Sequence, residues 1–453
     1  MVRKHREEIN MVSKEAKLEQ IKRDIFEKIS KYYEVKGKEG FTPGKDRILY
    51  AGAVFDAKEA SSMVDSILKG WFGLGPKARE FTEMFSKYLG VSKTVLVNSG
   101  SSADLLALLS LRSKKIENPI EKGAEIITPA VTFPTTFNPI LQTDLTPMIV
   151  DVDVETYNIN IEQLKESISS KTRAIVLPHT LGNPNDMDAI MDIVEDHDLY
   201  LIEDNCDALG SEFGGKKTGS FGIMSTYSFY PAHHITMGEG GAVAITKNDT
   251  QLYRTMVSLR DWGRDCWCEG DEKSPNGACK KRLDWEIDGI KYDHRYIYSH
   301  IGYNLKPTEI MTAMCLEQLK RLDDFNKKRR KNFQYLYSNL KKYSDSLIMP
   351  VKHKKANPSW FAFPITVKQD AGFSRKDITT YLEKKGIMTR LIFAGDITKQ
   401  PAYKDIKFKT SGPLTNSEIV MKNSFFVGVY PGLDESRLKY MIEAFDRFFK
   451  EVR

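Results

Sequence analysis

Two adjacent histidines, His233 and His234, stand between a run of residues typical of a buried strand and a glycine-rich turn. The stretch Ser225–Gly241 reads Ser-Thr-Tyr-Ser-Phe-Tyr-Pro-Ala-His-His-Ile-Thr-Met-Gly-Glu-Gly-Gly. Loops between buried strands are where α/β proteins present their chemistry. Because imidazole is a general base near neutral pH, the pair predicts proton transfer at this loop. The glycines alone are equally well explained as turn residues.

Three other apolar runs also end in residues that suit a ligand site. Asn98–Ala103 places small hydroxyl side chains at the start of a helix, where free N–H groups and the helix dipole favour an anion, although a plain N-cap is the alternative. Phe133 would lie flat on a planar ligand or belong to the core. Asp204 ends a buried strand, where a carboxylate is costly unless it is paired. It suits a ring nitrogen that the carboxylate keeps protonated.

Four of the five cysteines follow the spacing C-x59-C-x-C-x10-C: Cys206, Cys266, Cys268 and Cys279. Five cysteines in 453 residues do not make a disulfide framework. Four thiolates are what a 2Fe–2S cluster requires. Zinc is the chief alternative, although structural zinc sites prefer two to four residues between paired cysteines. Unrelated buried cysteines are the third possibility, and Cys315 is expected in the core.

The elements that must position these residues alternate between strand-like and helical runs. Amphipathic helical stretches such as 102–111, 161–169 and 187–196 separate most of the early strands. This alternation predicts an α/β fold with a mostly parallel, seven-stranded sheet, whose ligands lie outside the carboxyl ends of the strands. The expected strands are 94–97, 125–128, 147–150, 173–177, 200–203, 224–230 and 242–246.

The chain is long enough for more than one domain. We expect an N-terminal helical extension at 1–60, a large cofactor-binding domain at 61–325 with a cysteine-bearing loop near 261–300, and a smaller C-terminal α/β domain at 326–453. A net charge of +6 gives no case for a nucleic-acid partner, and no apolar run approaches the roughly 18 residues of a membrane span. The acidic and basic N-terminus lacks a signal peptide's apolar core, so a cytoplasmic location is expected.

Taken together, the strand ends resemble the sugar-modifying aminotransferase family, which has the type I pyridoxal-phosphate (PLP) aminotransferase fold. The resemblance covers about residues 70–450 and rests on 98–103, 132–138, 203–210, 228–241 and 302–304. It implies that Ser101, Ser102 and Ser228 hold the cofactor phosphate. It also implies that Phe133 stacks on the pyridine ring and that Asp204 pairs with the pyridine nitrogen. Asn304 would reach the phosphate of a neighbouring subunit, which implies a homodimer.

The chain departs from this family at one decisive position. The family pattern is Ser-Phe-x-x-x-Lys, in which the lysine forms a Schiff base, and here Ser228 leads instead to His233. An imidazole forms no stable Schiff base, so ordinary transamination is lost. Pyridoxamine 5′-phosphate (PMP) brings its own amine to a keto substrate, and a base at His233 would remove the C4′ proton and drive out a β-hydroxyl. His234 competes for this role, but the motif position favours His233.

Within the family, this histidine together with the cysteines resembles the branch of CDP-4-keto-6-deoxy-D-glucose 3-dehydratases. The cysteine intervals here are slightly longer than in that branch. The branch implies a nucleotide-linked 4-keto-6-deoxyhexose substrate, PMP, a 2Fe–2S cluster, and an NADH-dependent flavin/iron–sulfur reductase as electron donor. Such enzymes belong to dideoxysugar and lipopolysaccharide biosynthesis. Basic residues suited to the substrate's diphosphate include Arg295, Lys306 and Arg390, although surface solvation is the better default for each of them separately.

Two other functions remain open at this point. The first is a cluster-free 3-dehydratase that deaminates its product and recharges its cofactor with glutamate. The second is a catalytically silent relative that retains the cofactor but serves as a regulator or an inactive dimer partner.

Overall fold

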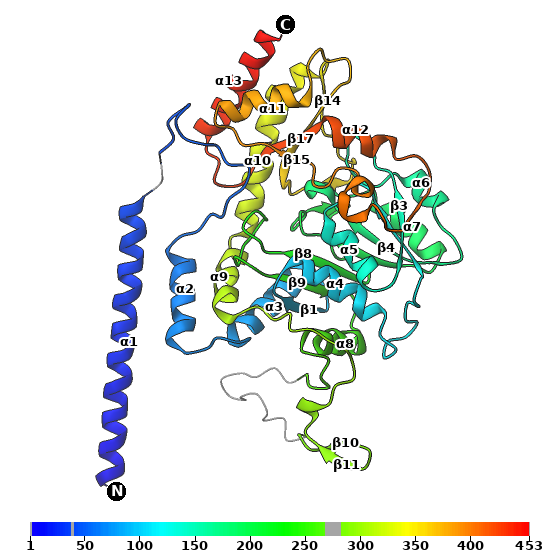
Figure 1. Cartoon of the computed structure of the whole chain (residues 1–453). Coiled ribbons are helices and arrows are strands. Elements are labelled where there is room, and N and C mark those ends of the chain that lie inside the picture. The colour runs from blue at the N-terminus through cyan, green and yellow to red at the C-terminus, as the bar shows by residue number, and fades with distance from the viewer. Residues whose placement is uncertain (1, 38–39, 268–281, 453) are drawn as a thin grey trace.

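The computed structural model describes residues 2–37, 40–267 and 282–452, with side chains from residue 14 onward. All seven predicted strands form within one large sheet, which confirms the α/β prediction (Figure 1). In spatial order the sheet runs β1-β9-β8-β5-β4-β2-β3-β16. The bounds of the predicted seven are β1 (Lys93–Val97), β2 (Glu125–Pro129), β3 (Thr146–Val150), β4 (Thr172–Pro178), β5 (Tyr200–Asp204), β8 (Met224–Ser228) and β9 (Gly241–Ile245).

The large sheet differs from the expectation in two ways. Strand β9 runs antiparallel to both of its neighbours, β1 and β8, while the strands from β8 through β3 are parallel. An eighth strand, β16 (Lys409–Thr410), comes from the C-terminal part of the chain and pairs with β3 in parallel. A strand of two residues is too short to show a periodic pattern, so this strand was not predicted.

Helices cover both faces of the large sheet, and side-chain alternation along each strand supplies both layers. On β4, Ala174 and Val176 face the layer of α4 and α8, whereas Ile175 and Leu177 face α6 and α7. At the other end of the sheet, Leu96 packs against α3 and α9. The helices around this sheet are α2 (Ala57–Leu68), α3 (Pro76–Leu89), α4 (Gly100–Leu111), α5 (Pro134–Gln142), α6 (Ile161–Glu166), α7 (Met187–Asp196), α8 (Thr250–Arg260) and α9 (Glu309–Leu319).

The C-terminal part builds a second, antiparallel sheet in the order β12-β14-β17-β15, with its own apolar core. The chain from Glu309 to Leu340 forms two helices, α9 and α10, that meet at Lys320–Arg321. Helix α9 packs on α2 and α3, whereas α10 packs on α13, so the helix axis turns between the two cores. These elements are α10 (Leu322–Leu340), α11 (Arg375–Lys384), α12 (Thr415–Asn423), α13 (Glu435–Glu451), β12 (Leu347–Ile348), β14 (Ala362–Val367), β15 (Arg390–Leu391) and β17 (Ser424–Gly428).

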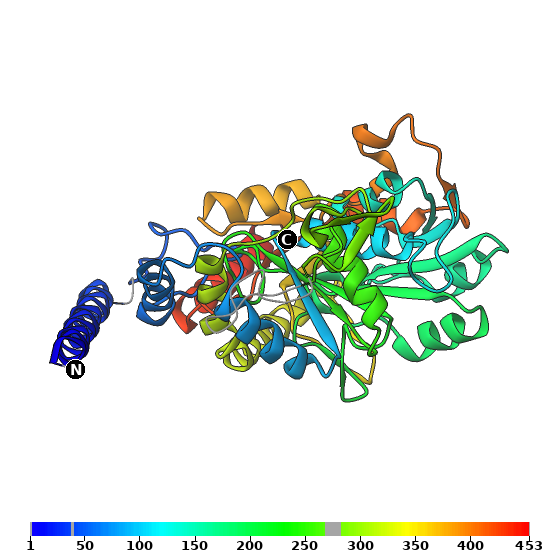
Figure 2. The same ribbon diagram turned by 90° about the horizontal axis from the view of Figure 1, so that it is seen from below.

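Several elements lie at the periphery. Helix α1 (Val2–Lys36) stands beside the body, next to α2, in both views (Figures 1 and 2). The hairpin of β10 (Trp285–Ile287) and β11 (Ile290–Tyr292) projects from the opposite end to α13 (Figure 1). A short three-stranded sheet joins β6 (Glu212–Phe213), β7 (Lys216–Lys217) and β13 (Ala356–Asn357). Within the described ranges, every helix is too short or too polar to cross a membrane.

Candidate active site

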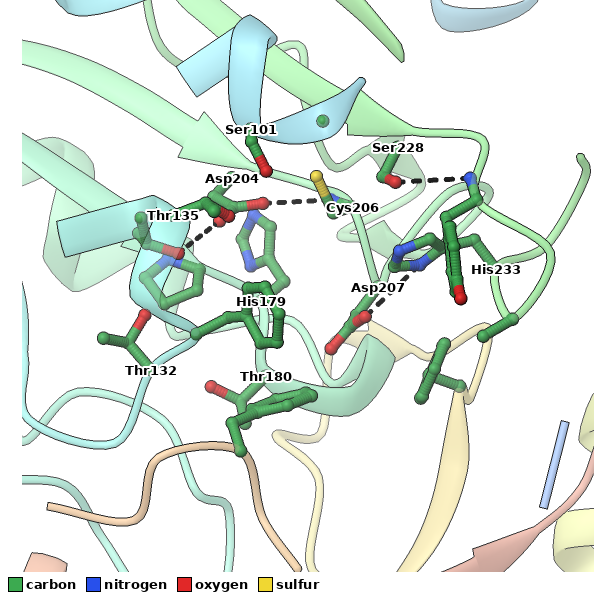
Figure 3. A pocket seen from close by; sticks show the side chains of 18 of the residues that line it. Ser101, Thr132, Thr135, His179, Thr180, Asp204, Cys206, Asp207, Ser228 and His233 are labelled. Carbon is green, nitrogen blue, oxygen red and sulfur yellow. Dashed lines mark hydrogen bonds and ion pairs between the residues drawn. The ribbon is translucent and has the colours of Figure 1, made fainter. Parts of the chain in front are cut away.

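A cavity of about 530 Å³ opens at the carboxyl ends of β1, β2, β4, β5 and β8 (Figure 3). Parallel strands deliver their following loops to one edge of the sheet, which is why residues far apart in sequence meet here. Residues of the antiparallel sheet and of the segment before α2 form the outer wall, among them Tyr50, Arg390 and Phe393. Six of the predicted site residues line the cavity: Ser101, Phe133, Asp204, Cys206, Ser228 and His233.

One end of the cavity is formed by the N-terminus of α4. Ser99 caps this helix by accepting a hydrogen bond from the N–H of Ser102, and Ser101 points toward the cavity (Figure 3). Gly100 allows the helix to approach β8 closely, because a Cβ there would lie 2.6 Å from the Cβ of Ser228. The Ser102 hydroxyl donates to Asn98 Oδ1 and is not among the lining residues. Unpaired N–H groups and the helix dipole make this end suited to a phosphate.

Asp204 lies on the cavity floor with its carboxylate almost fully buried. Thr136 donates from its hydroxyl to Oδ2 at 2.6 Å, and the N–H of Cys206 donates to Oδ1 at 3.2 Å. Among the described residues, no lysine, arginine or histidine pairs with this carboxylate. A buried carboxylate without a cation is costly, so the site favours a positively charged partner such as a protonated ring nitrogen.

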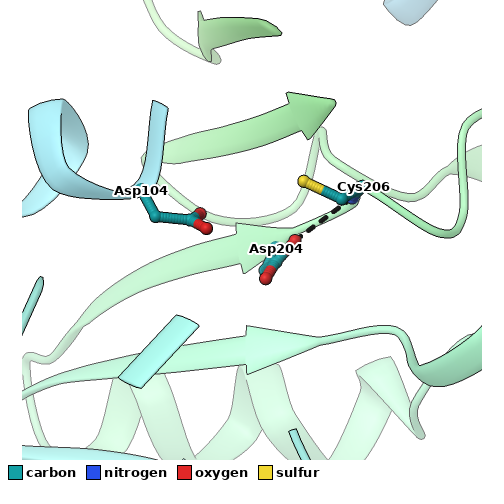
Figure 4. A group of neighbouring side chains, drawn as sticks. All are labelled: Asp104, Asp204 and Cys206. Atoms are coloured by element: carbon teal, nitrogen blue, oxygen red, sulfur yellow. Dashed lines mark hydrogen bonds between the residues drawn. The ribbon is translucent and has the colours of Figure 1, made fainter. Parts of the chain in front are cut away.

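Two further groups lie close to Asp204: Asp104 on α4 and Cys206 just after β5 (Figure 4). Asp104 is buried, and its Oδ1 accepts a hydrogen bond from the Thr226 hydroxyl at 2.5 Å, while its Oδ2 has no partner. Burial and the nearby charge of Asp204 raise the pKa of Asp104 well above its usual value. The same two causes raise the pKa of the Cys206 thiol. These shifts favour the neutral forms of the Asp104 carboxyl and the Cys206 thiol.

His233 enters the cavity from the loop after β8, in the position that the motif gives to a lysine. The imidazole packs against the Phe361 ring at 5.4 Å, and Arg329 donates to the His233 carbonyl at 3.1 Å. Burial, reinforced by the charge of Arg329, lowers the pKa of His233 to about 3. The ring is therefore neutral at physiological pH and has a lone pair to accept a proton. His234 points elsewhere, with Nε2 2.7 Å from the Ser359 carbonyl, and does not line the cavity.

Asp207 is a site residue that the sequence analysis missed. Its Oδ1 lies 3.5 Å from Nδ1 of His233 (Figure 3), and both side chains are mostly buried. Burial and the charge of Asp204 raise the pKa of Asp207 to about 8. The signal was present in the sequence, since Asp207 is the third residue after Asp204 in the same strand-end loop. The sequence did not indicate that this loop faces the loop that carries His233.

The remaining predicted residues have different positions. Phe133 precedes α5 and lines the cavity with half of its surface exposed, its ring edge-on to Phe393. Asn304 lies outside the cavity, where it forms an isolated bridge with Asp261 and is exposed in the single chain. An exposed Asn304 is compatible with its expected role toward a second subunit, which a single chain does not test.

The cysteines predicted to bind a cluster are only partly described. Cys206 lies in the cavity, near Gly100 at the start of α4. Cys266 follows Asp265, whose carboxylate pairs at 2.9 Å with Lys115, beyond the end of that helix. Cys206 therefore lies beside the first residue of α4, whereas the residue before Cys266 pairs with a lysine beyond the last residue of that helix. The other two predicted ligands, Cys268 and Cys279, lie outside the described residues.

Fold and site together define a class of protein. The mixed, mostly parallel sheet, the buried carboxylate and the helix N-terminus around one cavity are those of a PLP-dependent enzyme with the aminotransferase fold. The model of the DegT/DnrJ/EryC1/StrS aminotransferase family matches residues 55–446, and the chain belongs to this family.

Relatives with functional names include sugar dehydratases. A dTDP-4-dehydro-2,6-dideoxy-D-glucose 3-dehydratase from Saccharopolyspora spinosa is 43% identical over 427 residues, covering 94% of this chain and 91% of the relative. The lipopolysaccharide biosynthesis protein RfbH of Salmonella typhimurium is 42% identical over 412 residues, covering 90% and 93%. A solved structure of the GDP-4-keto-6-deoxy-D-mannose-3-dehydratase of E. coli with bound hydrated PLP is 31% identical, with a TM-score of 0.78. The match covers 88% of this chain and 99% of that one.

Proposed function

We propose that this protein removes the 3-hydroxyl group of a nucleotide-linked 4-keto-6-deoxyhexose, with PMP as cofactor and His233 as the base. The observation that carries the proposal is the imidazole at the lysine position of a cofactor cavity whose described lining residues include no lysine. A site without that amine is unsuited to ordinary amino transfer but retains a proton acceptor. The relatives named as 3-dehydratases support the same reaction class.

The residues present fit PMP. The cavity volume of about 530 Å³ falls in the range of roughly 300–1,000 Å³ that small-molecule sites occupy. Asp204 would hold the pyridine nitrogen, and the start of α4 with Ser101 and Ser228 would hold the phosphate. Phe133 offers a partly exposed ring at the cavity wall. Bound PMP supplies an amine for the 4-keto group and a ring that delocalises the charge left when a proton is removed.

His233 performs the proton transfer in this proposal. Its neutral imidazole takes up the proton from C4′ and can return one to the departing 3-hydroxyl, so that water leaves. Asp207, 3.5 Å from Nδ1, holds the ring in one orientation, and Arg329 fixes the backbone carbonyl of His233. Thr136 and the Cys206 N–H donate hydrogen bonds to Asp204 and orient its carboxyl group toward the ring nitrogen.

The reaction is tested by incubating PMP-loaded protein with nucleotide-linked 4-keto-6-deoxyhexoses. Loss of the 3-hydroxyl oxygen requires two electrons, which come either from NADH through a reductase or from PMP, whose amine is then lost as ammonia and restored by glutamate. Parallel reactions therefore contain either NADH with a reductase or glutamate. Mass spectrometry should find a sugar product that has lost the 3-hydroxyl oxygen and carries no nitrogen at C4. A 4-amino sugar as the main product would contradict the proposal.

The proposal also includes a 2Fe–2S cluster bound by this chain and an NADH-dependent flavin/iron–sulfur reductase as the electron donor. The close spacing of Cys266, Cys268 and Cys279 supports it. The Cys206 thiol lies beside Asp104 and Asp204, and burial together with these carboxylates raises its pKa. Anaerobically purified protein should contain about two irons per chain if the cluster is bound, and iron-free protein that still dehydrates its substrate would refute it.

A second candidate is the cluster-free dehydratase that deaminates its product. It is supported by the likeness to a solved GDP-4-keto-6-deoxymannose-3-dehydratase with a trapped PLP-glutamate geminal diamine, which is 31% identical. In that case glutamate alone should sustain turnover, with no need of NADH or a reductase. A homodimer in which Asn304 reaches the partner's cofactor is proposed for either reaction, and light scattering of the full chain tests the subunit number.

A further inference from the structure

Arg390 stands in the cavity wall without a carboxylate partner. The sequence offered three basic residues for a diphosphate, and the structure separates them. Arg295 pairs with Asp293 at 2.9 Å and Lys306 with Asp261 at 3.4 Å, both outside the cavity. Among the described residues, no Asp or Glu forms an ion pair with Arg390.

The position of Arg390 is fixed by an aromatic ring instead of an acid. Its guanidinium lies over the Tyr50 ring, 4.4 Å from the centroid, and Tyr50 in turn packs edge-on against Phe426. One nitrogen, Nη1, donates to the Thr389 carbonyl at 2.8 Å. A guanidinium carries five N–H donors in a planar fork, so most remain available. Stacking on the ring orients the guanidinium without neutralising its charge. The oriented group can then donate hydrogen bonds to a phosphate.

The charges of the cavity make Arg390 the single cation for an incoming anion. No other arginine and no lysine is among the described residues that line the cavity. The floor carries Asp204, and exposed Glu239 contributes a second carboxyl group. These acids disfavour an anion, so a substrate with a diphosphate needs a compensating cation.

The geometry of the substrate points to the same place. The 4-keto carbon must reach His233 on the floor, while the diphosphate is attached at C1, across the hexose ring. The diphosphate must therefore lie toward the outer wall, where Arg390 and the aromatic residues stand. Phe133 and Tyr230 each expose 51% of their surface, which leaves rings for the sugar or the base.

We infer that Arg390 binds the diphosphate of the nucleotide-linked substrate and thereby sets the cavity's preference for nucleoside-diphosphate sugars. This inference rests on the proposed function, because a nucleotide-linked substrate is part of it.

The test measures binding to PMP-loaded full-length protein by calorimetry. The probes are CDP, dTDP and GDP, the corresponding nucleosides, and inorganic pyrophosphate. Arg390→Ala should weaken the tightest nucleoside diphosphate by about 10- to 100-fold, as expected for lost hydrogen bonds to a charged group, and leave nucleoside affinity unchanged. The affinity of Arg390→Lys for that nucleoside diphosphate should lie between those of wild type and Arg390→Ala, because a point charge replaces the planar guanidinium. Arg173→Ala is the matched control, since Arg173 also donates to a neighbouring carbonyl but lies at the opposite end of β4 from the cavity.

The outcomes separate this inference from the proposed function. Arg390→Ala protein that binds nucleoside diphosphates as tightly as wild type would overturn the inference, and so would equal losses for nucleosides and diphosphates. Wild-type protein that binds none of the diphosphates would overturn it too. Diphosphate binding that depends on Arg390 in a protein that forms only 4-amino sugars would support the inference and refute the proposed dehydration.

Discussion

Replacing Asp207 by asparagine should slow the reaction and stabilise the protein at the same time. Asparagine preserves the shape of the side chain but removes the carboxyl group that lies 3.5 Å from Nδ1 of His233. Both groups are neutral at physiological pH, so a hydrogen bond between them contributes about 0.5–1.5 kcal/mol. The 3.5 Å separation is long for such a bond, so the low end applies, which corresponds to about a twofold loss in rate.

The stability effect has the opposite sign because the pKa of Asp207 is raised to about 8 in the folded chain, above its ordinary value of 3.8. The folded state then holds a proton that the unfolded state releases at neutral pH. The free energy of unfolding therefore falls as pH rises from about 4 to about 8. Asp207→Asn removes this dependence, so its melting temperature should exceed that of wild type at pH 8, and the difference should shrink toward pH 4.

The assay pairs scanning calorimetry across that pH range with the rate of C4′ proton exchange. Asp151→Asn is a suitable control, because Asp151 is also buried but accepts hydrogen bonds from the N–H groups of Asn416 and Ser417. It should lose stability and leave exchange unchanged while the protein is folded. An Asp207→Asn protein that is less stable at pH 8 and exchanges at the wild-type rate would show that Asp207 is structural and does not position His233.

Three further variants test the site. Gly100→Ala should cost about 1–3 kcal/mol and weaken PMP binding, because its Cβ would meet Ser228, whereas Gly73→Ala has open space and should change neither. The buried His234 has a pKa well below its usual 6.5, so the free energy of unfolding should fall by up to about 1.4 kcal/mol per pH unit below pH 6.5. In urea titrations at several pH values, His234→Gln should reduce this dependence of the free energy of unfolding on pH. The same slope against pH as in wild type would contradict the prediction. Asp204→Asn should release PMP in equilibrium dialysis, since no buried charge then pairs with the ring nitrogen; wild-type retention would refute that pairing.

Much of the fold could be predicted because its signals are local. Each of the seven strands from β1 to β9 in the large sheet is an apolar run bounded by turn residues. The residues at their carboxyl ends, such as Asp204 and His233, were found for the same reason. Tyr50 and Arg390 were not placed, because they reach the cavity through packing between distant segments. A local periodic pattern does not predict which distant segment will cover a cavity. For the same reason it did not predict strand β16.

The C4′ position of the cofactor offers the most direct test of the central claim, that His233 is the base of a dehydratase site. Protein loaded with PMP carrying deuterium at C4′ is mixed with substrate, and release of the label into water is followed. Wild type should release one label stereospecifically as the sugar loses its 3-hydroxyl. His233→Asn should release it more slowly by about 10²- to 10⁴-fold, the usual contribution of a general base. Release at the wild-type rate from His233→Asn would contradict the account.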